Sequence, residues 1–489
     1  MTTMRASLPA RAARSAARRA AALVLAAGGL AACSVDRINA PIESAVTPEG
    51  AAANPTGALR LLATGIIVQN RASQGVWIRD ASLFGREAFY FQLQDSRWTT
   101  GYFRDYDVNT SFGAGGVWGG RLANLRNIFG FRRSVTALET VLGAPAASAA
   151  RGFASTEEAL NVQNLVNSRF NLGTPVQVDS GVASVTPFVT RDSAYRFVSG
   201  TLDAGFAQLG AAGAAGSFPF TLPGSGWTGF NTPATYGQYN RAIKARNEVY
   251  RGSLGCGATC YQAALAALGQ SFVTATLTTA NLNTGVYYTT STATGDATNA
   301  IWGIRNDLYA NTSITTDPTI PQTDARLTSK LATGAPSRSQ SGSEASTIRF
   351  NRYATNDAPI TVIDNEELWL IRAEALWFTG DRAGATAALN TVARVAGGAT
   401  GDRYTQAAND ADFVTQLLAE RRLSLLLEGH RWVDVRRFGR LNTLPAGGTG
   451  FTVATQQVVP AAECQARDVL IRSGGSEALR GPGCPPPAQ

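Results

Sequence analysis

The stretch from residue 365 to residue 396, NEELWLIRAEALWFTGDRAGATAALNTVARVA, predicts two helices and the turn between them. Apolar or small residues recur at helical spacing in both halves, at Leu368, Ile371 and Ala375 and then at Ala385, Ala388, Leu389 and Val392. Gly380 can end the first helix and Asp381 can cap the second. Two antiparallel helices with alanines at their contact are the unit of a tetratricopeptide-like stack, although the strict repeat consensus is absent.

Other segments extend this pattern to a mainly α fold built of helical hairpins. Residues 239–252 and 260–268 predict a second hairpin, so that the helical pairs cover 239–268 and 365–430. Helical patterns also occur at 57–69, 119–142, 155–168 and 192–209.

The segment from about 271 to 350 differs in composition from the helical parts. Threonine, serine, asparagine and glycine dominate it, with short β-prone pieces such as residues 286–289. We expect long loops with a few short strands that cap the helical part. The Pro/Gly-rich tail, 474–489, is expected to have no fold of its own beyond a disulfide constraint.

The N-terminus predicts export. Five arginines and no acid precede the apolar run 20–30, which is too short to span a membrane, and Leu-Ala-Ala then leads into Cys33. Residues 1–32 therefore form a predicted lipoprotein signal peptide, with Cys33 as the lipidated residue; the alternative is an ordinary secretory cleavage. Residues 33–56, rich in proline, are the predicted tether, and 57–489 the predicted single domain.

The charge balance argues against nucleic acid as a partner. Removal of residues 1–32 takes away five arginines and no acid, so the net charge falls from +8 to +3. The remaining charges are mixed in sign along the chain, whereas a nucleic-acid protein keeps a concentrated basic face.

Four further cysteines fit an oxidising compartment. They form two local groups, Cys256 with Cys260 and Cys464 with Cys484, which predicts two disulfides. A zinc site is the alternative, but with one histidine in the chain its ligands would have to come from both groups or from carboxylates. We expect no metal and no cofactor.

Little in the sequence indicates catalysis. The only histidine, His430, leaves few histidine-dependent mechanisms, and residues 224–229 match G-x-G-x-x-G in what reads as a loop. A two-carboxylate glycosidase stays open, with Asp105 and Asp107 as the best candidate pair.

Aromatic residues suggest a ligand platform at residues 98–106, WTTGYFRDY. Its rings can stack on sugars, and they are Trp98, Tyr102, Phe103 and Tyr106, followed by Phe112 and Trp118. Ordinary core packing is the alternative. A second candidate group consists of Trp227, Phe230, Tyr236 and Tyr239.

A charged stretch follows the hairpins at 420–440, ERRLSLLLEGHRWVDVRRFGR. Its helix places charges beside a buried face, and buried charges persist when they pair with one another. The predicted ion-pair network that fixes the turn comprises Glu420, Arg421, Glu428, Arg431 and Asp434, with Trp432 and Phe438 as apolar packing.

These two stretches together resemble the C-terminal signature of the SusD/RagB-like lipoproteins. The shared positions are Arg372 to Ala375, Gly380-Asp381, Ala385 to Asn390, Arg394 to Gly397, Glu420-Arg421, Glu428-Gly429, Arg431, Asp434 and Arg437. The usual Glu-Leu after Glu-Arg is replaced by Ser424-Leu425.

The resemblance implies a SusD-like fold and a non-catalytic lipoprotein of the outer membrane, exposed at the cell surface. Such a protein would bind an oligosaccharide or a peptide and pass it to a SusC-like TonB-dependent transporter. Two alternatives remain from the residues alone: a surface glycan hydrolase, and a helical-repeat scaffold for envelope assembly.

Overall fold

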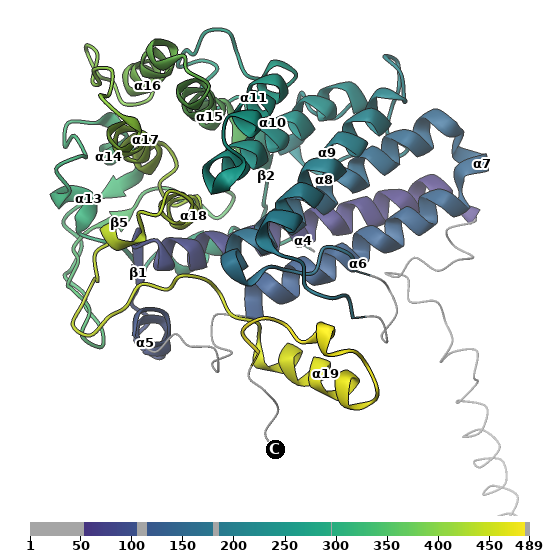
Figure 1. Ribbon diagram of the computed structural model, residues 1–489, viewed down its shortest axis with the longest axis horizontal. Coiled ribbons are helices and arrows are strands. Elements are labelled where there is room, and N and C mark those ends of the chain that lie inside the picture. The colour runs from purple at the N-terminus through teal and green to yellow at the C-terminus, as the bar shows by residue number, and fades with distance from the viewer. Residues whose placement is uncertain (1–52, 105–114, 179–184, 295, 485–489) are drawn as a thin grey trace, which may run out of the picture. The chain divides into compact units, whose positions relative to one another are not determined.

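Long helices and their connecting loops make up most of the chain (Figure 1). The computed structural model describes residues 53–104, 115–178, 185–294 and 296–484. The predicted signal peptide, Cys33 and most of the predicted tether lie outside these residues and stay predictions. Residues Asn54–Gln489 form one compact unit.

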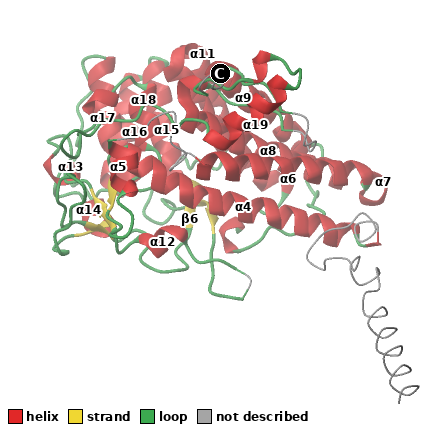
Figure 2. Cartoon of the chain, turned by 90° about the horizontal axis from the view of Figure 1, so that it is seen from below, coloured by secondary structure: helices red, strands yellow, loops and turns green. Residues whose placement is uncertain are grey.

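Four long helices run side by side in the first half: α4 (Pro55–Phe84), α6 (Gly115–Ala137), α8 (Ala144–Arg169) and α9 (Arg191–Gly210) (Figures 1 and 2). The short helix α7 (Glu139–Leu142) lies at the turn between α6 and α8. The predicted helix 57–69 is wrong at both ends. It starts earlier because the Asn54 side chain accepts a hydrogen bond from the Gly57 amide and Pro55 occupies the first turn.

The far end of α4 was missed because its middle is polar. Asn70 and Ser73 interrupt the apolar pattern, yet both are buried. The Asn70 amide donates to Glu157 of α8 over 2.5 Å, so a polar contact between helices replaces an apolar one.

The predicted second hairpin is present as α10 (Pro233–Arg251), the π-type turn η3 (Gly252–Cys256) and α11 (Ala258–Gly269). Helix α10 begins six residues before the predicted start at 239. Thr232 and Thr235 form a reciprocal capping box there, with Pro233 in the first turn.

The C-terminal hairpins agree closely with the opening stretch of sequence. They consist of α15 (Asn365–Phe378), α16 (Arg382–Val395), α17 (Asp410–Ser424) and α18 (Arg431–Arg437). Asp364 and Asp381 cap α15 and α16 through their side chains. Trp377 and Phe413 stack with ring centroids 4.2 Å apart, which joins α15 to α17.

The loop-rich region contains short strands, as predicted, and also short helices, which were not predicted. One antiparallel sheet has the order β1 (Ala88–Tyr90), β3 (Leu308–Ala310), β5 (Arg349–Phe350), β4 (Leu331–Ala332), and β2 (Gly285–Tyr288) pairs antiparallel with β6 (Ile360–Asp364). The helices are α12 (Ala300–Ile304), α13 (Ser313–Thr316) and α14 (Ala325–Lys330).

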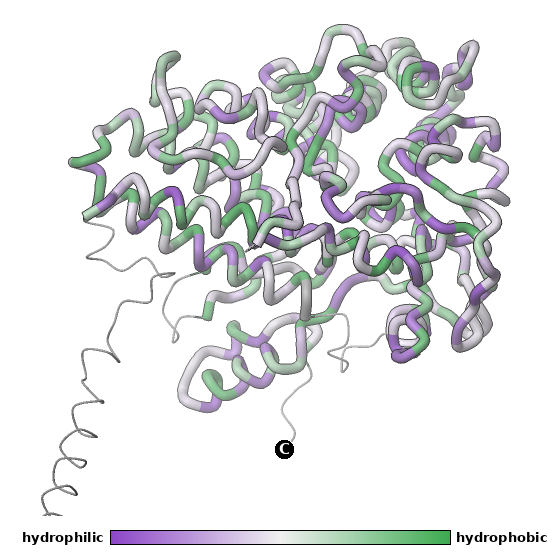
Figure 3. Tube along the Cα trace, turned by 180° about the vertical axis from the view of Figure 1, so that it is seen from behind, coloured by the Kyte–Doolittle hydropathy of each residue, from purple (hydrophilic) through white to green (hydrophobic). Residues whose placement is uncertain are grey.

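The remaining elements are α5 (Arg97–Phe103), α19 (Ala461–Arg472) and the 3-10 turns η1 (Phe170–Leu172), η2 (Ser225–Trp227), η4 (Leu441–Thr443) and η5 (Glu477–Leu479). Apolar and polar residues alternate along the helices (Figure 3). The apolar faces meet in one large core and in a smaller core between α15, α16 and α17.

Candidate ligand-binding cavity

A polar cavity of about 520 Å³ lies where the loop-rich region meets the C-terminal hairpins. Its lining comes from segments far apart in sequence: Ser225, Gly226, Asn283, Tyr287, Thr289, Lys330, Arg352, Pro359, Thr361, Asp364, Glu366 and Glu428. Strand pairing of β2 with β6 brings Tyr287 opposite Thr361 and so forms one wall.

The glycine-rich loop at 224–229 shapes a second wall. A side chain at Gly226 would place its Cβ only 2.0 Å from the Tyr287 carbonyl oxygen, so this close approach requires glycine. Tyr287 is half-buried, and its hydroxyl donates to the Asn283 carbonyl over 2.6 Å. The loop thus fixes an aromatic ring at the cavity, and no strand among the described residues leads into this loop, as a nucleotide-binding loop would need.

Charged groups of both signs line the cavity. Arg352 pairs with Glu428 at 2.8 Å and donates to the Thr361 hydroxyl at 3.0 Å. Lys330 donates to the Leu423 carbonyl at 3.0 Å. Among the described residues, Glu366 Oε1 has no hydrogen-bond partner, and its nearest cation is Arg326 at 3.6 Å.

Burial shifts the ionisation of these groups. Burial, together with repulsion by Glu428 and Glu366, raises the pKa of Asp364 well above its ordinary value. Burial also raises the pKa of Glu428, although Arg352 acts against this shift, and it lowers the pKa of Lys330. A site with an aromatic ring, acceptors and cations can hold a polar ligand through stacking and hydrogen bonds.

The charged stretch at 420–440 divides into separate groups, which corrects the predicted single network. Of its five members only Arg421 and Asp434 pair with each other, at 2.8 Å. Glu420 pairs with Arg326 at 2.6 Å and with Arg403 at 3.1 Å, and Glu428 pairs with Arg352. Arg431 forms no ion pair with any described residue. The partners of Glu420 and Glu428 come from helix α14 and from loops elsewhere in the chain, so the sequence of this stretch alone could not name them.

Asp434 leads into a buried cluster that the prediction lacked. It pairs with Arg437 at 2.9 Å, and Arg437 Nη2 donates to Glu374 over 2.7 Å. Burial acts against ionisation, but Arg421 and Arg437 hold the pKa of Asp434 below its ordinary value. Trp432 is buried and donates to the Ala454 carbonyl at 2.8 Å, whereas Phe438 is half-buried.

The comparisons with known proteins agree with this architecture. The model of the SusD family matches residues 328–469. A SusD superfamily protein from Bacteroides vulgatus ATCC 8482 is similar, with 14% identity, a TM-score of 0.57, and coverage of 87% of this chain and 95% of that one. NanU from B. fragilis gives 14% identity, a TM-score of 0.59, and coverage of 83% and 95%. Residues 328–469 thus resemble the SusD family in sequence, and the fold of the chain is SusD-like.

A further similar structure is an outer membrane protein from B. vulgatus ATCC 8482 whose suggested role is nutrient binding. It is 11% identical to this chain, with a TM-score of 0.58, and the match covers 86% of this chain and 100% of that one. Among curated proteins, none matches the chain.

The predicted mainly α, SusD-like fold with helical hairpins is confirmed. None of the described helices of this SusD-like chain has both the length and the apolarity needed to cross a membrane.

The predicted aromatic platform of the SusD-like chain is wrong for two of its four rings. Tyr102 and Phe103 are fully buried, where Tyr102 donates to Asp80 over 2.8 Å and Phe103 stacks on Phe451 at 5.6 Å. Trp98 is half-buried and stacks on Tyr102 at 5.6 Å. These rings fill the core because burying a large apolar side chain is favourable, so they are not available to a ligand.

The other aromatic candidates of the SusD-like chain are also core residues or lie outside the description. Trp118 is buried and stacks on Phe188. The alternative group, Trp227, Phe230, Tyr236 and Tyr239, is buried throughout. Tyr106, Phe112 and the candidate acids Asp105 and Asp107 lie outside the described residues.

Both cysteine pairs form disulfides in the SusD-like chain. Cys256–Cys260 closes the turn between α10 and α11, and Cys464–Cys484 ties α19 to the tail. Within the described part of the chain, histidine, cysteine and acidic side chains do not gather in a group of three that could hold a metal.

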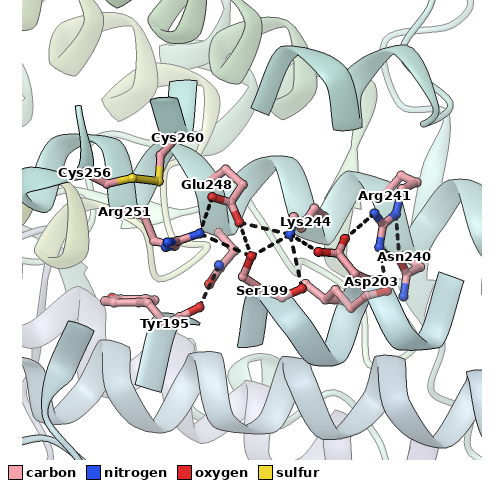
Figure 4. Close-up of polar contacts among 12 residues, drawn as sticks. Tyr195, Ser199, Asp203, Asn240, Arg241, Lys244, Glu248, Arg251, Cys256 and Cys260 are labelled. Carbon is pink, nitrogen blue, oxygen red and sulfur yellow. Dashed lines mark hydrogen bonds and ion pairs between the residues drawn. A yellow bond between two sulfur atoms is a disulfide. The ribbon is translucent and has the colours of Figure 1, made fainter. Parts of the chain in front are cut away.

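A polar network between α9 and α10 lies beside the first disulfide (Figure 4). Lys244 sits between Asp203 at 2.7 Å, Glu248 at 3.3 Å and the Ser199 hydroxyl at 2.5 Å. Arg251 also pairs with Glu248, at 2.7 Å. The contacts of Ser199 and Asp203 with Lys244 and Arg251 join two helices of the SusD-like scaffold, and sequence reasoning missed them because these partners lie about 40 to 50 residues apart.

His430 is half-buried beside Glu367: its side chain is 13% exposed, and Nδ1 lies 3.9 Å from the Glu367 carboxylate. Burial lowers the pKa of His430 to about 4, against the attraction of Glu367. The imidazole is therefore neutral at pH 7. His430 is not among the residues that line the polar cavity.

Proposed function

We propose that this SusD/RagB-like chain is a non-catalytic surface lipoprotein that binds an oligosaccharide or a peptide. The observation that carries the proposal is the polar cavity, in which Tyr287 offers a ring face and Lys330, Glu366 and Arg352 offer donors and acceptors. Sugar hydroxyls and peptide amides both bind through such a mixture of stacking and hydrogen bonds. The suggested nutrient-binding role of the similar B. vulgatus outer membrane protein supports the same reading.

The protein is proposed to act at the outer membrane together with a transporter. Lipid on Cys33 anchors the chain to the outer membrane, exposed at the cell surface, and the ligand passes to a SusC-like TonB-dependent transporter. Gentle solubilisation of native membranes, capture of this protein and mass spectrometry of what accompanies it test the partner. Recovery of a β-barrel with a plug domain in near-equal amount is expected; its absence would contradict the delivery role.

Ligand binding is tested by screening glycans and peptides on the purified chain and titrating each hit by calorimetry. Tyr287→Ala is expected to weaken a true ligand by about tenfold, because stacking on the ring is lost. Trp302→Ala is the matched control, since Trp302 is a half-buried ring outside the cavity. Equal weakening by both variants, or by neither, would contradict the assignment of the cavity.

The carboxyls of the cavity favour binding over hydrolysis. Asp364 accepts the Glu367 amide at the start of α15, and Glu428 is paired with Arg352, so both have structural partners. We expect no reducing ends to accumulate when the chain is incubated with a bound glycan. Their accumulation, and its loss in Glu366→Gln, would instead establish the glycan hydrolase alternative.

A further inference from the structure

A second cavity, of about 320 Å³, lies between α17, α18, η4 and the loop that follows α13. It shares no lining residue with the polar cavity of the proposed function. Its lining consists of Asp317, Thr319, Thr415, Leu418, Ala419, Arg421, Arg422, Arg431, Asp434, Val435, Arg440 and Thr443.

The charge of this cavity is positive. Four arginines line it against two aspartates, and the carboxylates of both aspartates are already engaged. Asp434 accepts from Arg421 and from Arg437, the latter outside the lining. Asp317 accepts from Arg422 at 2.9 Å and from the amide and hydroxyl of Thr319. The lining therefore has no free carboxylate to balance its remaining positive charge.

Several guanidinium nitrogens at this cavity lack acceptors. Within the described residues, Arg421 Nη1 and Nη2, Arg422 Nε, and Arg431 Nε and Nη1 are buried without a hydrogen-bond partner. Arg421 is 2% exposed and Arg422 is 5% exposed. Glu87 and Asp317 act on Arg431 through charge alone, with no hydrogen bond to it. Buried charged donors are normally hydrogen-bonded, because leaving them unpaired is costly.

The rest of the lining suits the uncharged part of a small organic molecule. Leu418, Ala419 and Val435 contribute apolar surface. The hydroxyls of Thr415 and Thr443 donate to backbone carbonyls at 3.0 and 2.7 Å, so their oxygens are left to accept from a ligand hydroxyl or amide.

We propose that this arginine cavity binds the oxyanion, a carboxylate or a sulfate, of a small organic ligand. Guanidinium groups match both anions through paired charge-assisted hydrogen bonds. The anion supplies the acceptors that the buried nitrogens lack, while the threonines and the apolar wall hold the remainder of the molecule. This binding does not depend on the polar cavity or on a transporter.

Calorimetry on the full chain in detergent, at low ionic strength, tests the proposal with D-glucuronate, inorganic sulfate and neutral D-glucose as probes. We expect glucuronate to bind and glucose not to bind at this cavity. Equal affinities for sulfate and glucuronate would mean that the oxyanion alone is recognised. A higher affinity for glucuronate would mean that the sugar also contributes to binding. Absence of binding by both anions would overturn the proposal.

Variants locate the binding. Arg431→Gln is expected to weaken both anions by about tenfold or more, since charge-assisted hydrogen bonds are lost. Leu418→Trp keeps every charge but fills the cavity, and we expect it to abolish glucuronate binding. Arg394→Gln is the matched control, because Arg394 pairs with Asp402 on the exposed surface. Anion affinity unchanged in both Arg431→Gln and Leu418→Trp would overturn the proposal.

Discussion

Arg437 and Arg431 stand six residues apart in one short helix, yet their surroundings differ. Arg437 donates to Asp434, to Glu374 and to the Ser253 hydroxyl, so its guanidinium has acceptors on every side. Arg431 hydrogen-bonds to no described residue, and its Nε and Nη1 are buried. One arginine closes a scaffold contact, and the other has donors available to a ligand. The chemical type of a residue in this stretch does not reveal its role; the positions of the acceptors do.

The two arginines also differ in charge stabilisation. Burial lowers the pKa of Arg437, but Glu374 and Asp434 outweigh it and raise this pKa well above its ordinary value. For Arg431, burial lowers the pKa to about 10, and Glu87 and Asp317 only partly oppose the shift. A graded series of substitutions can therefore separate scaffold arginines from ligand arginines.

The largest effect is expected for Arg437→Gln. This substitution leaves the buried Glu374 carboxylate without its cation and leaves Asp434 with Arg421 alone, which costs about 3–5 kcal/mol of unfolding free energy. Urea denaturation measures it, with Arg394→Gln as an exposed control that costs about 1 kcal/mol or less. Similar losses of unfolding free energy in Arg437→Gln and Arg394→Gln would contradict the assignment of Arg437 to the buried scaffold.

Arg422→Gln should have an intermediate effect. Arg422 keeps contacts with Asp317 and with the Ser313 hydroxyl, at 2.9 and 2.7 Å, but its Nε is unpaired. Loss of these contacts is expected to cost about 2–3 kcal/mol in the same denaturation experiment. A cost equal to that of Arg437→Gln would place Arg422 with the scaffold arginines.

His430, which directly precedes Arg431 in sequence, gives a pH-dependent effect on stability. Its folded pKa of about 4 lies below the ordinary value of 6.5, so the unfolded chain binds a proton first as pH falls. The stability that it contributes is present above pH 6.5 and is lost as pH falls toward 4. Relative to the wild type, His430→Asn should gain about 1–2 kcal/mol between neutral pH and pH about 4.5.

The difference in stability between the wild type and His430→Asn isolates the effect of His430 from that of other groups that titrate in the same pH range. Burial raises the pKa of Glu87 and of Glu157 to about 7, and these carboxyls stabilise the fold as pH falls. Both are retained in His430→Asn, so their contributions cancel in the comparison. Parallel pH profiles of stability would show that the imidazole carries no such shift.

The smallest effect on stability is expected for Arg431→Gln, about 1 kcal/mol or less in either direction. Its guanidinium makes no hydrogen bond to a described residue, and removing a buried charge without a partner relieves its desolvation. Thermal denaturation in the absence of added anions measures this. A loss as large as that of Arg437→Gln would make Arg431 a scaffold residue.

The sequence predicted what local chemistry determines. The hairpin at 365–396 was correctly placed because its helix faces, Gly380 and the Asp381 cap all lie within one short stretch. The two disulfides followed from cysteine spacing. The polar cavity could not be predicted from the sequence, since Tyr287, Lys330 and Glu428 meet only through the tertiary fold. The aromatic platform failed because rings that can face a ligand can equally fill a core, as Tyr102 and Phe103 do.

The most direct test is a crystal of the chain soaked in selenate and examined by anomalous scattering. The expected result is a selenium peak inside the arginine cavity, with selenate oxygens within hydrogen-bond distance of Arg431 and of Arg421 or Arg422. A cavity that holds only water at high selenate occupancy elsewhere would contradict the division between scaffold and ligand arginines.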